Sequence, residues 1–441
     1  MTEKRTDSMT VRRDIRMDMP ADVSYIIGKL REAGHEAFAV GGCVRDTLLG
    51  RTPGDWDITT SAKPEEVKQV FKRTIDTGIE HGTVTVLLHH TGYEVTTYRI
   101  DGAYLDGRHP EQVTFTGSLV EDLRRRDFTI NAMAYSDETG IVDAFCGIED
   151  LENGIIRCVG TAKERFTEDA LRILRAVRFS AQLDFAIAED TWNALSDIAP
   201  NLVHVSRERI QVELTKTLLS EHPEKVLMVD ETGMTPYISE TFSALFTAED
   251  PAGRKALLRE YLIRAAELPA DRILRWAALL GESGTGAAEK ILWELKLARD
   301  TIDGAKMLTE SFHEAFPAES KEGDAAAEEE RLYRIRLKMS RMPAELFDKL
   351  ILLKRTLLPE EREVMEEVRN AAEEIRQRGE CISLKTLAVN GGDLIRAGVK
   401  PGPEMGRILG EMLDHVLRYP KENEKQRLMT YFGVNGETDH E

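Results

Sequence analysis

The stretch Val40-Gly41-Gly42-Cys43-Val44-Arg45-Asp46, followed shortly by Asp55-Trp56-Asp57, decides the fold of this 441-residue chain. The two glycines separate a short β-rich run at 37–40 from a helical pattern at 43–49. Glycine lets a backbone come close to a ligand, and free amides at the start of a helix favour phosphate. A plain turn would also use a Gly-Gly pair, so the acidic residues that follow are what favour a phosphate site.

Asp55 and Asp57 are the second part of this pattern. We expect a strand over 56–60, and residues two apart on a strand point to the same face. The two carboxylates would repel each other unless a cation lay between them, and oxygen ligands of this kind suit Mg²⁺ that holds substrate phosphates. Glu94 begins a further predicted strand and is a candidate third ligand, with a structural salt bridge as the alternative.

Around this stretch, β-rich runs alternate with helical patterns. Strands are predicted at 37–40, 56–60, 83–88, 93–98 and 141–145, and helices at 23–30, 43–49, 64–71 and 119–135. Adjacent strands joined by a turn predict a small mixed β-sheet with helices packed on it, which is an α+β unit. From residue 163 onward only helical patterns remain, so the rest of the chain is expected to be all-α.

These patterns predict five segments. They are a disordered arm over 1–20, a sheet-containing head over 21–160, a helical neck over 161–222, a helical body over 223–375 and a helical tail over 376–441. Within the body, an acidic and alanine-rich stretch at 319–330 is either a solvated helix face or a flexible link.

Composition narrows the class of protein. With 41% hydrophobic residues the chain can form cores, and its net charge of −19 disfavours indiscriminate nucleic-acid binding but not a local basic surface. We find no run of about 18 apolar residues and no apolar leader segment, so we expect neither a membrane span nor secretion. The four cysteines form no CxxC pair, which fits a reducing cytoplasm. Nothing in the sequence implies a stable protein partner.

Five motifs in order resemble one family. They are Gly41-Gly42-x-Val44-Arg45-Asp46 with Asp55-x-Asp57, then Arg125-Arg126-Asp127-Phe128-Thr129-Ile130-Asn131-Ala132, Gly147-x-x-Asp150-Leu151 with Ile156-Arg157, Glu168-Asp169-x-x-Arg172-x-x-Arg175, and Ser206-x-Glu208-Arg209-Ile210. This set, over about 35–220, resembles the class II tRNA nucleotidyltransferase and poly(A) polymerase family. The C-terminal stretches 387–391 and 400–403 look like the tail of CCA-adding enzymes from Gram-positive bacteria. The region 221–375 matches no motif.

The resemblance implies a metal-dependent nucleotidyl transfer. By similarity, Asp55 and Asp57 bind Mg²⁺, which lowers the pKa of the attacking tRNA 3′-hydroxyl and holds the α-phosphate. Gly42 and Arg45 would contact the triphosphate of the incoming nucleotide. For Arg45, an ion pair with Asp46 on the helix surface is the alternative.

The second motif would meet the sugar and phosphates. By similarity, Arg126 contacts phosphate, and Asp127 accepts from the ribose 2′-hydroxyl, which would favour NTP over dNTP. Asn131 either assists in this or is a buried structural residue.

The fourth motif would select the base. We expect 169 and 172 to lie on one helix, where residues three apart are neighbours on one face. Asp169 could then accept from the amine of cytosine or adenine, while Arg172 donates to the adjacent ring nitrogen. Arg175 and Arg178 would stabilise Arg172 or the phosphates. Without the other motifs, an ion-paired helix face would be the better explanation of these residues.

Two further regions are candidates for roles in the reaction. The polar loop at 99–112 resembles the loop that helps the family switch from C to A addition, with Asp106 and Arg108 as candidate lever residues, although His109 departs from the expected Arg. A plain surface loop is the alternative. A basic cluster is either a tRNA backbone contact or a solvated helix face. Its members are Arg331, Arg334, Arg336, Lys338 and Arg341.

We therefore predict a CCA tRNA nucleotidyltransferase that binds tRNA and uses CTP and ATP, with release of pyrophosphate. One alternative is a poly(A) polymerase or an enzyme that adds only A. Another is a catalytically inactive RNA-binding protein on the same scaffold. The long helical C-terminal half disfavours a nucleotidyltransferase that acts on a small molecule.

Overall fold

The computed structural model describes residues 9–102, 113–247, 250–284, 286–316 and 325–434. The chain divides into two compact units. The first comprises Met1–Pro251 with Glu294–Lys296, and the second comprises Ala252–Trp293 with Leu297–Glu441.

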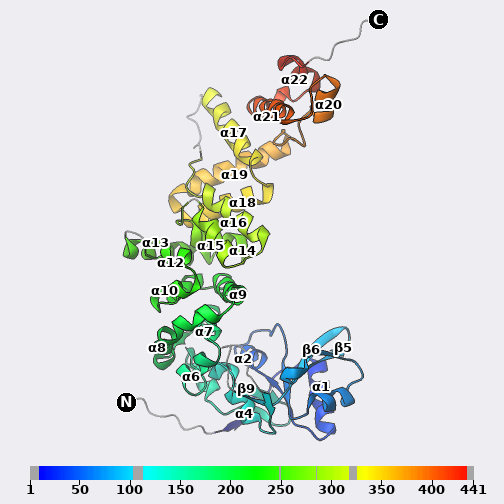
Figure 1. Cartoon of the computed structure of the whole chain (residues 1–441), viewed down its shortest axis with the longest axis vertical. Coiled ribbons are helices and arrows are strands. Elements are labelled where there is room, and N and C mark those ends of the chain that lie inside the picture. The colour runs from blue at the N-terminus through cyan, green and yellow to red at the C-terminus, as the bar shows by residue number, and fades with distance from the viewer. Residues whose placement is uncertain (1–8, 103–112, 248–249, 285, 317–324, 435–441) are drawn as a thin grey trace. The chain divides into compact units, whose positions relative to one another are not determined.

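An eight-stranded mixed sheet organises the first unit and confirms the predicted fold class (Figure 1). Only β3 and β6 run parallel among its described neighbours. In spatial order the strands are β1 Thr10–Arg12, β10 Gly140–Asp143, β9 Met133–Ser136, β2 Ala37–Val40, β3 Ile58–Thr60, β6 Thr91–Thr97, β5 Thr83–Leu88 and β4 Thr74–Gly78.

Apolar side chains on both faces of the sheet fix its helices in place. The first helix α1 (Ala21–Glu32) buries Val23, Ile26, Ile27 and Leu30, the predicted stripe at i, i+3, i+4 and i+7. Two short helices, α2 (Gly42–Leu48) and α3 (Pro64–Val70), follow at their predicted positions. Helix α2 begins directly after β2, so the sheet determines where the side chains of α2 lie.

Two sequence predictions about the head are wrong. The helix expected over 119–135 stops early, because α4 covers only Leu119–Arg124 and a 3₁₀ turn at Thr129–Asn131 leads into β9. Pairing of β9 with both β2 and β10 overrides the local helical pattern. The arm expected to be disordered over 1–20 contains β1, whose residues pair with β10.

Helices make up most of the rest of the first unit. Helix α6 packs on α8, and α7 packs on α9. The exceptions are the two-residue parallel strands β11 (Ile155–Ile156) and β12 (Ala186–Ile187), neither of which the sequence predicted. The helices are α5 Gly147–Glu152, α6 Ala162–Glu168, α7 Leu171–Leu183, α8 Glu189–Ile198, α9 Arg207–Leu218, α10 Met228–Glu231, α11 Thr235–Ile238 and α12 Glu240–Ala244.

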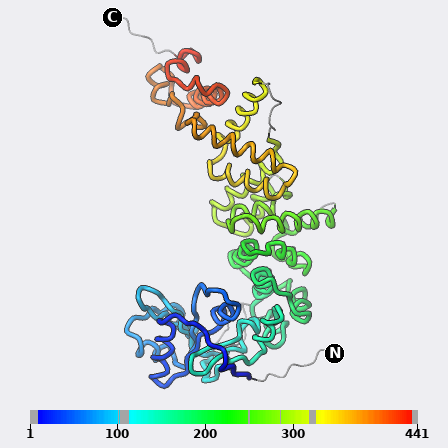
Figure 2. The backbone as a smooth tube through the Cα atoms, turned by 180° about the vertical axis from the view of Figure 1, so that it is seen from behind, coloured from blue at the N-terminus to red at the C-terminus, as the bar shows by residue number. Residues whose placement is uncertain are grey.

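The second unit is helical throughout its described residues (Figure 2). One core includes Phe312, Phe347 and Leu350, and a separate core near the C-terminus includes Val389, Met412 and Val416. No described helix is long and apolar enough to cross a membrane. The helices are α13 Pro251–Ala265, α14 Arg272–Leu280, α15 Ala287–Glu294, α16 Arg299–Ser311, α17 Ala325–Ser340, α18 Ala344–Leu357, α19 Arg362–Gln377, α20 Gly391–Arg396, α21 Pro403–Arg418 and α22 Lys425–Tyr431.

Candidate active site

The Gly-Gly turn between β2 and α2 forms one wall of the site. Gly41 has φ +84°, and a Cβ added there would lie 3.0 Å from Nη1 of Arg126. The Gly41 amide donates to the carbonyl of Met133 at 3.2 Å, and the Val40 amide donates to the carbonyl of Asp57 at 3.0 Å. Glycine is therefore required at 41, and the turn is fixed beside both the second motif and the Asp-x-Asp pair.

The acidic pair lies just ahead of its strand. Strand β3 begins at Ile58 and not at 56 as predicted, so Asp55 and Asp57 occupy the approach to the strand. The pKa of Asp57 is raised, first because surrounding protein desolvates the carboxylate and then because Asp55 repels its charge, while Arg126 opposes the shift. A carboxylate in this environment gains from a neighbouring cation.

Glu94 is the nearest further carboxylate. Strand β3 runs parallel to β6 with Ile58 opposite Val95, which puts Glu94 next to Asp57 at the same end of the two strands. Glu94 is exposed, and it also contributes to the raised pKa of Asp57. Among the described residues, no group of three His, Cys, Asp or Glu side chains is arranged to hold a metal ion. Two carboxylates alone would leave the other positions around a Mg²⁺ ion to water and substrate oxygens.

A polar chain connects α2 to α7 through the second motif. Arg45 pairs with Asp46, the alternative considered from the sequence, and its Nη1 also donates to Oδ1 of Asn131 at 2.7 Å. Asn131 Nδ2 donates to Asp127 at 3.3 Å, and Arg175 Nε donates to the other oxygen of Asp127 at 2.7 Å. The predicted residues Arg45, Asn131, Asp127 and Arg175 therefore meet in one connected group.

Asp127 is the charged centre of this group. Burial alone would raise the pKa of its carboxyl, but Arg175 and Arg172 outweigh burial and hold the pKa at about 2. Asp127 is therefore ionised at neutral pH and acts only as a hydrogen-bond acceptor.

Arg126 has a hydrogen-bond donor to spare. Its Nε is buried and has no hydrogen-bond partner among the described residues, while its Nη2 lies 3.6 Å from Oδ2 of Asp122. A buried N–H without an acceptor costs about 1–3 kcal/mol, so this donor favours an added anion. Asp122 is fully buried and also accepts from Thr59 at 3.0 Å and Arg125 at 2.8 Å. The sequence analysis missed Asp122, because a buried acid cannot be told from a surface one by residue type.

The proposed base-reading residues do not share a helix. Asp169 has an extended backbone and separates α6 from α7, and Arg172 lies in the first turn of α7. The prediction that both lie on one helix face is therefore wrong. Asp169 instead accepts from the Leu171 amide at 3.1 Å and from Arg209 Nη2 at 2.7 Å. Arg209 belongs to the fifth motif, which the sequence analysis quoted without giving this residue a role.

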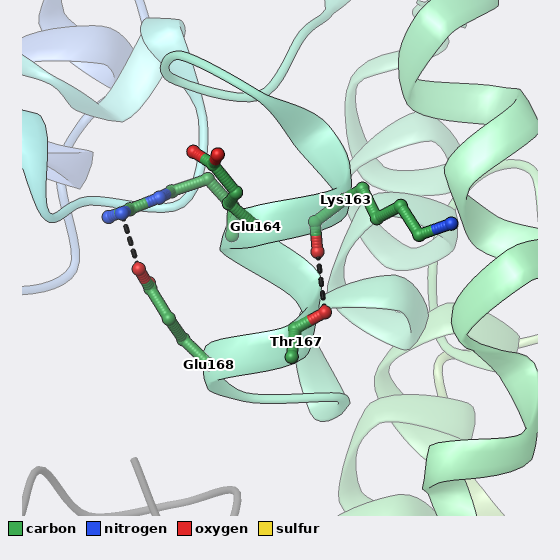
Figure 3. A pocket seen from close by; sticks show the side chains of 5 residues that line it. Lys163, Glu164, Thr167 and Glu168 are labelled. Atoms are coloured by element: carbon green, nitrogen blue, oxygen red, sulfur yellow. Dashed lines mark hydrogen bonds and ion pairs between the residues drawn. The ribbon is translucent and has the colours of Figure 1, made fainter. Parts of the chain in front are cut away.

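The last turn of α6 holds Arg172. Glu168 forms an ion pair with Arg165, and it accepts from Nη1 of Arg172 at 2.6 Å. Arg172 also donates to the carbonyls of Arg165 at 3.0 Å and Arg125 at 3.2 Å. Side chains of α6 line an open hollow of about 390 Å³. Figure 3 shows these side chains from close by. The hollow is lined by Lys163, Glu164, Arg165, Thr167 and Glu168.

The remaining predicted residues fall in different settings. Arg178 is buried and lies 3.0 Å from Glu213 of α9. The loop residues Asp106 and Arg108 lie outside the described residues. The two ends of that loop pair as β7 (Arg99–Asp101) and β8 (Val113–Phe115).

The basic cluster is not one exposed face. Arg331 and Arg336 are only 7% and 2% exposed, and Arg336 forms an ion pair with Glu380 at 2.6 Å. Arg334 and Arg341 are exposed, whereas Lys338 is held by Ser311 and Glu314. The prediction that all five residues lie on one exposed helix surface is therefore wrong for Arg331 and Arg336.

Three family models match successive parts of the chain. A poly A polymerase head domain matches 37–157, an RNA and SrmB-binding site of polymerase A matches 184–245, and a tRNA nucleotidyltransferase domain 2 matches 269–432. The first match contains the Gly-Gly turn, the Asp-x-Asp pair and the second motif.

Individual relatives extend this match to nearly the whole chain. A CCA-adding enzyme of Levilactobacillus brevis is 38% identical over 92% of this chain and 95% of its own length. The chain belongs to the CCA-adding enzymes. A family member from Leuconostoc mesenteroides is 56% identical over a shorter alignment, which covers 47% of this chain and 51% of the relative. The Bacillus stearothermophilus CCA-adding enzyme, solved in complex with CTP, superposes with a TM-score of 0.75 at 34% identity and covers 95% of this chain and 98% of that one.

Membership in the CCA-adding enzymes confirms the predicted activity. These enzymes are nucleotidyltransferases, and the family generally uses a divalent metal ion. The comparisons do not favour the two alternatives, a poly(A) or A-adding enzyme and an inactive RNA-binding protein.

Proposed function

We propose that this chain adds cytidine, cytidine and adenosine in turn to the 3′ end of tRNA at a single site in its first unit. The observation that carries the proposal is the convergence of the Asp55–Asp57 pair, the Gly41 turn and Arg126. The carboxylates of Asp55 and Asp57 lie close to a backbone turn that cannot carry a side chain at Gly41 and to Arg126, whose Nε has a hydrogen-bond donor to spare.

Asp55 and Asp57 would hold Mg²⁺. The metal ion would supply Lewis-acid stabilisation of the α-phosphate and would lower the pKa of the tRNA 3′-hydroxyl. Two protein carboxylates suit Mg²⁺, because this ion keeps several ligand positions for water and substrate phosphates. Glu94 would affect the site through its charge.

Gly42, Arg45 and Arg126 would bind the triphosphate. Arg126 would donate through its free Nε, and Gly42 would let the phosphates approach the backbone. Asp127, fixed by Arg175 and Asn131, would accept from the ribose 2′-hydroxyl and so favour NTP over dNTP.

Asp169 and Arg172 would select the base. A carboxylate can accept only, so Asp169 would favour the amine of cytosine or adenine over the carbonyl of uracil or guanine. Arg209 would orient Asp169 by their 2.7 Å contact, and Glu168 would orient Arg172. Arg178, which forms an ion pair with Glu213, would help to stabilise Arg172 or the phosphates.

The all-α segments would bind the tRNA. We infer a neck over 161–222, a body over 223–375 and a tail over 376–441, with the loop at 99–112 acting in the switch from C to A. In the body, Arg334, Lys338 and Arg341 would contact the tRNA backbone. The four cysteines are free thiols, which supports a cytoplasmic location.

The test is nucleotide incorporation into a tRNA that lacks its last three nucleotides. With CTP alone and Mg²⁺ we expect two additions, and with CTP and ATP three, with one pyrophosphate released at each step. Asp57→Ala should abolish incorporation at unchanged tRNA affinity. Asp76→Ala, which removes an exposed strand carboxylate paired with Lys68, is the matched control and should keep full activity.

Two results would contradict the proposal. Addition of A alone, or of long A tracts, would indicate a different polymerase activity. Full activity in the presence of a chelator, or in Asp57→Ala, would exclude the metal role of the acidic pair.

A further inference from the structure

Three arginines of the nucleotide site surround one aromatic ring. The guanidinium carbons of Arg178, Arg45 and Arg175 lie 4.3, 5.1 and 5.4 Å from the centre of the Phe179 ring. Phe179 is 6% exposed and lies on α7, whereas Arg45 comes from α2. The ring is therefore the point at which cations from two distant parts of the chain meet.

Like charges so close together need compensation. Each arginine has its own carboxylate, Asp46 for Arg45, Asp127 for Arg175 and Glu213 for Arg178. These acids come from α2, from the segment between α4 and the 3₁₀ turn, and from α9. The negative face of an aromatic ring attracts guanidinium groups, so Phe179 offers one shared surface on which all three can rest.

Phe179 is itself fixed by other rings. It packs edge-on against Phe128 of the second motif at 5.7 Å, and Phe128 packs against Phe166 of α6 at 6.5 Å. All three rings are buried, and Phe128 lies directly after Asp127. Since edge-to-face contacts are directional, the ring of Phe128 sets the orientation of Phe179 relative to the second motif.

We infer that Phe179 is a positioning residue for the nucleoside triphosphate, holding Arg45, Arg175 and Arg178 in the arrangement that receives its phosphates and ribose. The inference rests on the proposed function of this site. The repulsion among the arginines supports it, since the pKa of Arg178 is lowered by burial and by Arg175 and Arg45 despite the opposing effect of Glu213. A bound polyanion would relieve this repulsion.

The test is Phe179→Leu, which keeps an apolar side chain but removes the ring. Loss of cation–π contacts worth about 1–2 kcal/mol at a desolvated site should raise KM for CTP and for ATP by roughly tenfold. We expect kcat to change less than KM, and the preference between CTP and ATP to stay unchanged. Phe179→Tyr retains the ring and should recover most of the wild-type KM.

Phe166→Leu is the matched control, because it disrupts the same row of rings without touching an arginine. It should lower thermal stability comparably and leave KM close to wild type. Equal KM values for Phe179→Leu and Phe166→Leu would overturn the inference, as would failure of Phe179→Tyr to restore KM. If Phe179→Leu does not fold, Phe179→Met takes its place in the comparison of KM with Phe166→Leu. A wild-type protein that incorporates no CTP would instead overturn the proposed function.

Discussion

Asp127 lies at the centre of the polar chain that joins α2 to α7. Its two oxygens accept from Asn131 and Arg175, and its pKa of about 2 lies well below the ordinary value for an aspartate. A carboxyl whose pKa is lower in the folded state than in the unfolded state binds protons more readily when the chain unfolds. The same contacts that hold Asp127 in place should therefore make the head sensitive to acid.

The sign and size of this effect can be measured. Because the folded-state pKa of Asp127 is depressed, its contribution to the free energy of unfolding is complete above about pH 5 and is lost as the pH falls toward 2. A pKa shift of this size corresponds to about 2–3 kcal/mol, and about half of it is lost by pH 3. Asp127→Asn should reduce the free energy of unfolding at pH 7, and the gap to wild type should narrow from pH 5 to pH 3 in urea titrations. Asp76→Asn, at an exposed carboxylate, should show no such convergence. A gap that is independent of pH would contradict the assignment.

At the scale of helices and strands, the sequence predicted those features that depend on the local pattern of apolar and polar residues. The stripe of α1, the runs that form β2 and β5 and the order of the motifs could all be read directly. Features that depend on distant pairing could not. Residues 133–136 form β9 because they lie between β2 and β10, and β1 exists because Gly140, with φ +83° and no Cβ, lets the carbonyl of Arg12 come close.

The residues of the site also divide into those that could be predicted from the sequence and those that depend on distant contacts. Asp55 and Asp57 were predicted by residue type and spacing, and the arginines by the family resemblance. Asp122, Arg209 and Phe179 instead act through contacts over 23 or more residues of sequence. The break between α6 and α7 is the clearest example. Asp169 ends α6 because its side chain bonds the amide of Leu171, an alternative to continuing the helix that spacing alone does not reveal.

Because Asp169 lies at the break between α6 and α7, we expect its substitution to change base selection. Asp169→Asn keeps the shape of the side chain but adds a donor that can pair with the carbonyl of uracil. We expect incorporation of UTP relative to CTP to rise by about tenfold to a hundredfold, since an unsatisfied buried polar group costs about 1–3 kcal/mol and more when charged. Single-nucleotide incorporation with each of the four NTPs measures this ratio.

Asp184→Asn is the control for this change, because Asp184 ends α7 at its opposite end and pairs with Lys225. It should leave the UTP to CTP ratio unchanged. An equal loss with all four nucleotides in Asp169→Asn would indicate a structural role and not base selection.

At the scale of the whole molecule, a chain with a net charge of −19 must bind a polyanion through local basic surfaces. The burial of Arg331 and Arg336 removes them from such a surface; Arg331 pairs with Glu328 within α17, and Arg336 pairs with Glu380 outside it. What remains is a row at Arg334, Lys338 and Arg341, one turn apart, which together with Phe316 lines a hollow of about 150 Å³. Arg341 forms no ion pair with any described residue, so its charge is available to a phosphate.

This row predicts a defect in tRNA binding that is separate from the chemistry. Arg334→Ala combined with Arg341→Ala should weaken tRNA binding and reduce the slope of log K against log salt concentration by about 1–2, because each lost phosphate contact removes about one released counterion. The KM for CTP at saturating tRNA should not change. The matched control is Arg369→Ala, an exposed arginine on α19 paired with Glu366, much as Arg334 is paired with Glu330. Binding titrations at several salt concentrations measure these slopes. An unchanged slope in the double variant would show that this row does not contact the tRNA backbone, as would an equal loss of tRNA affinity in Arg369→Ala.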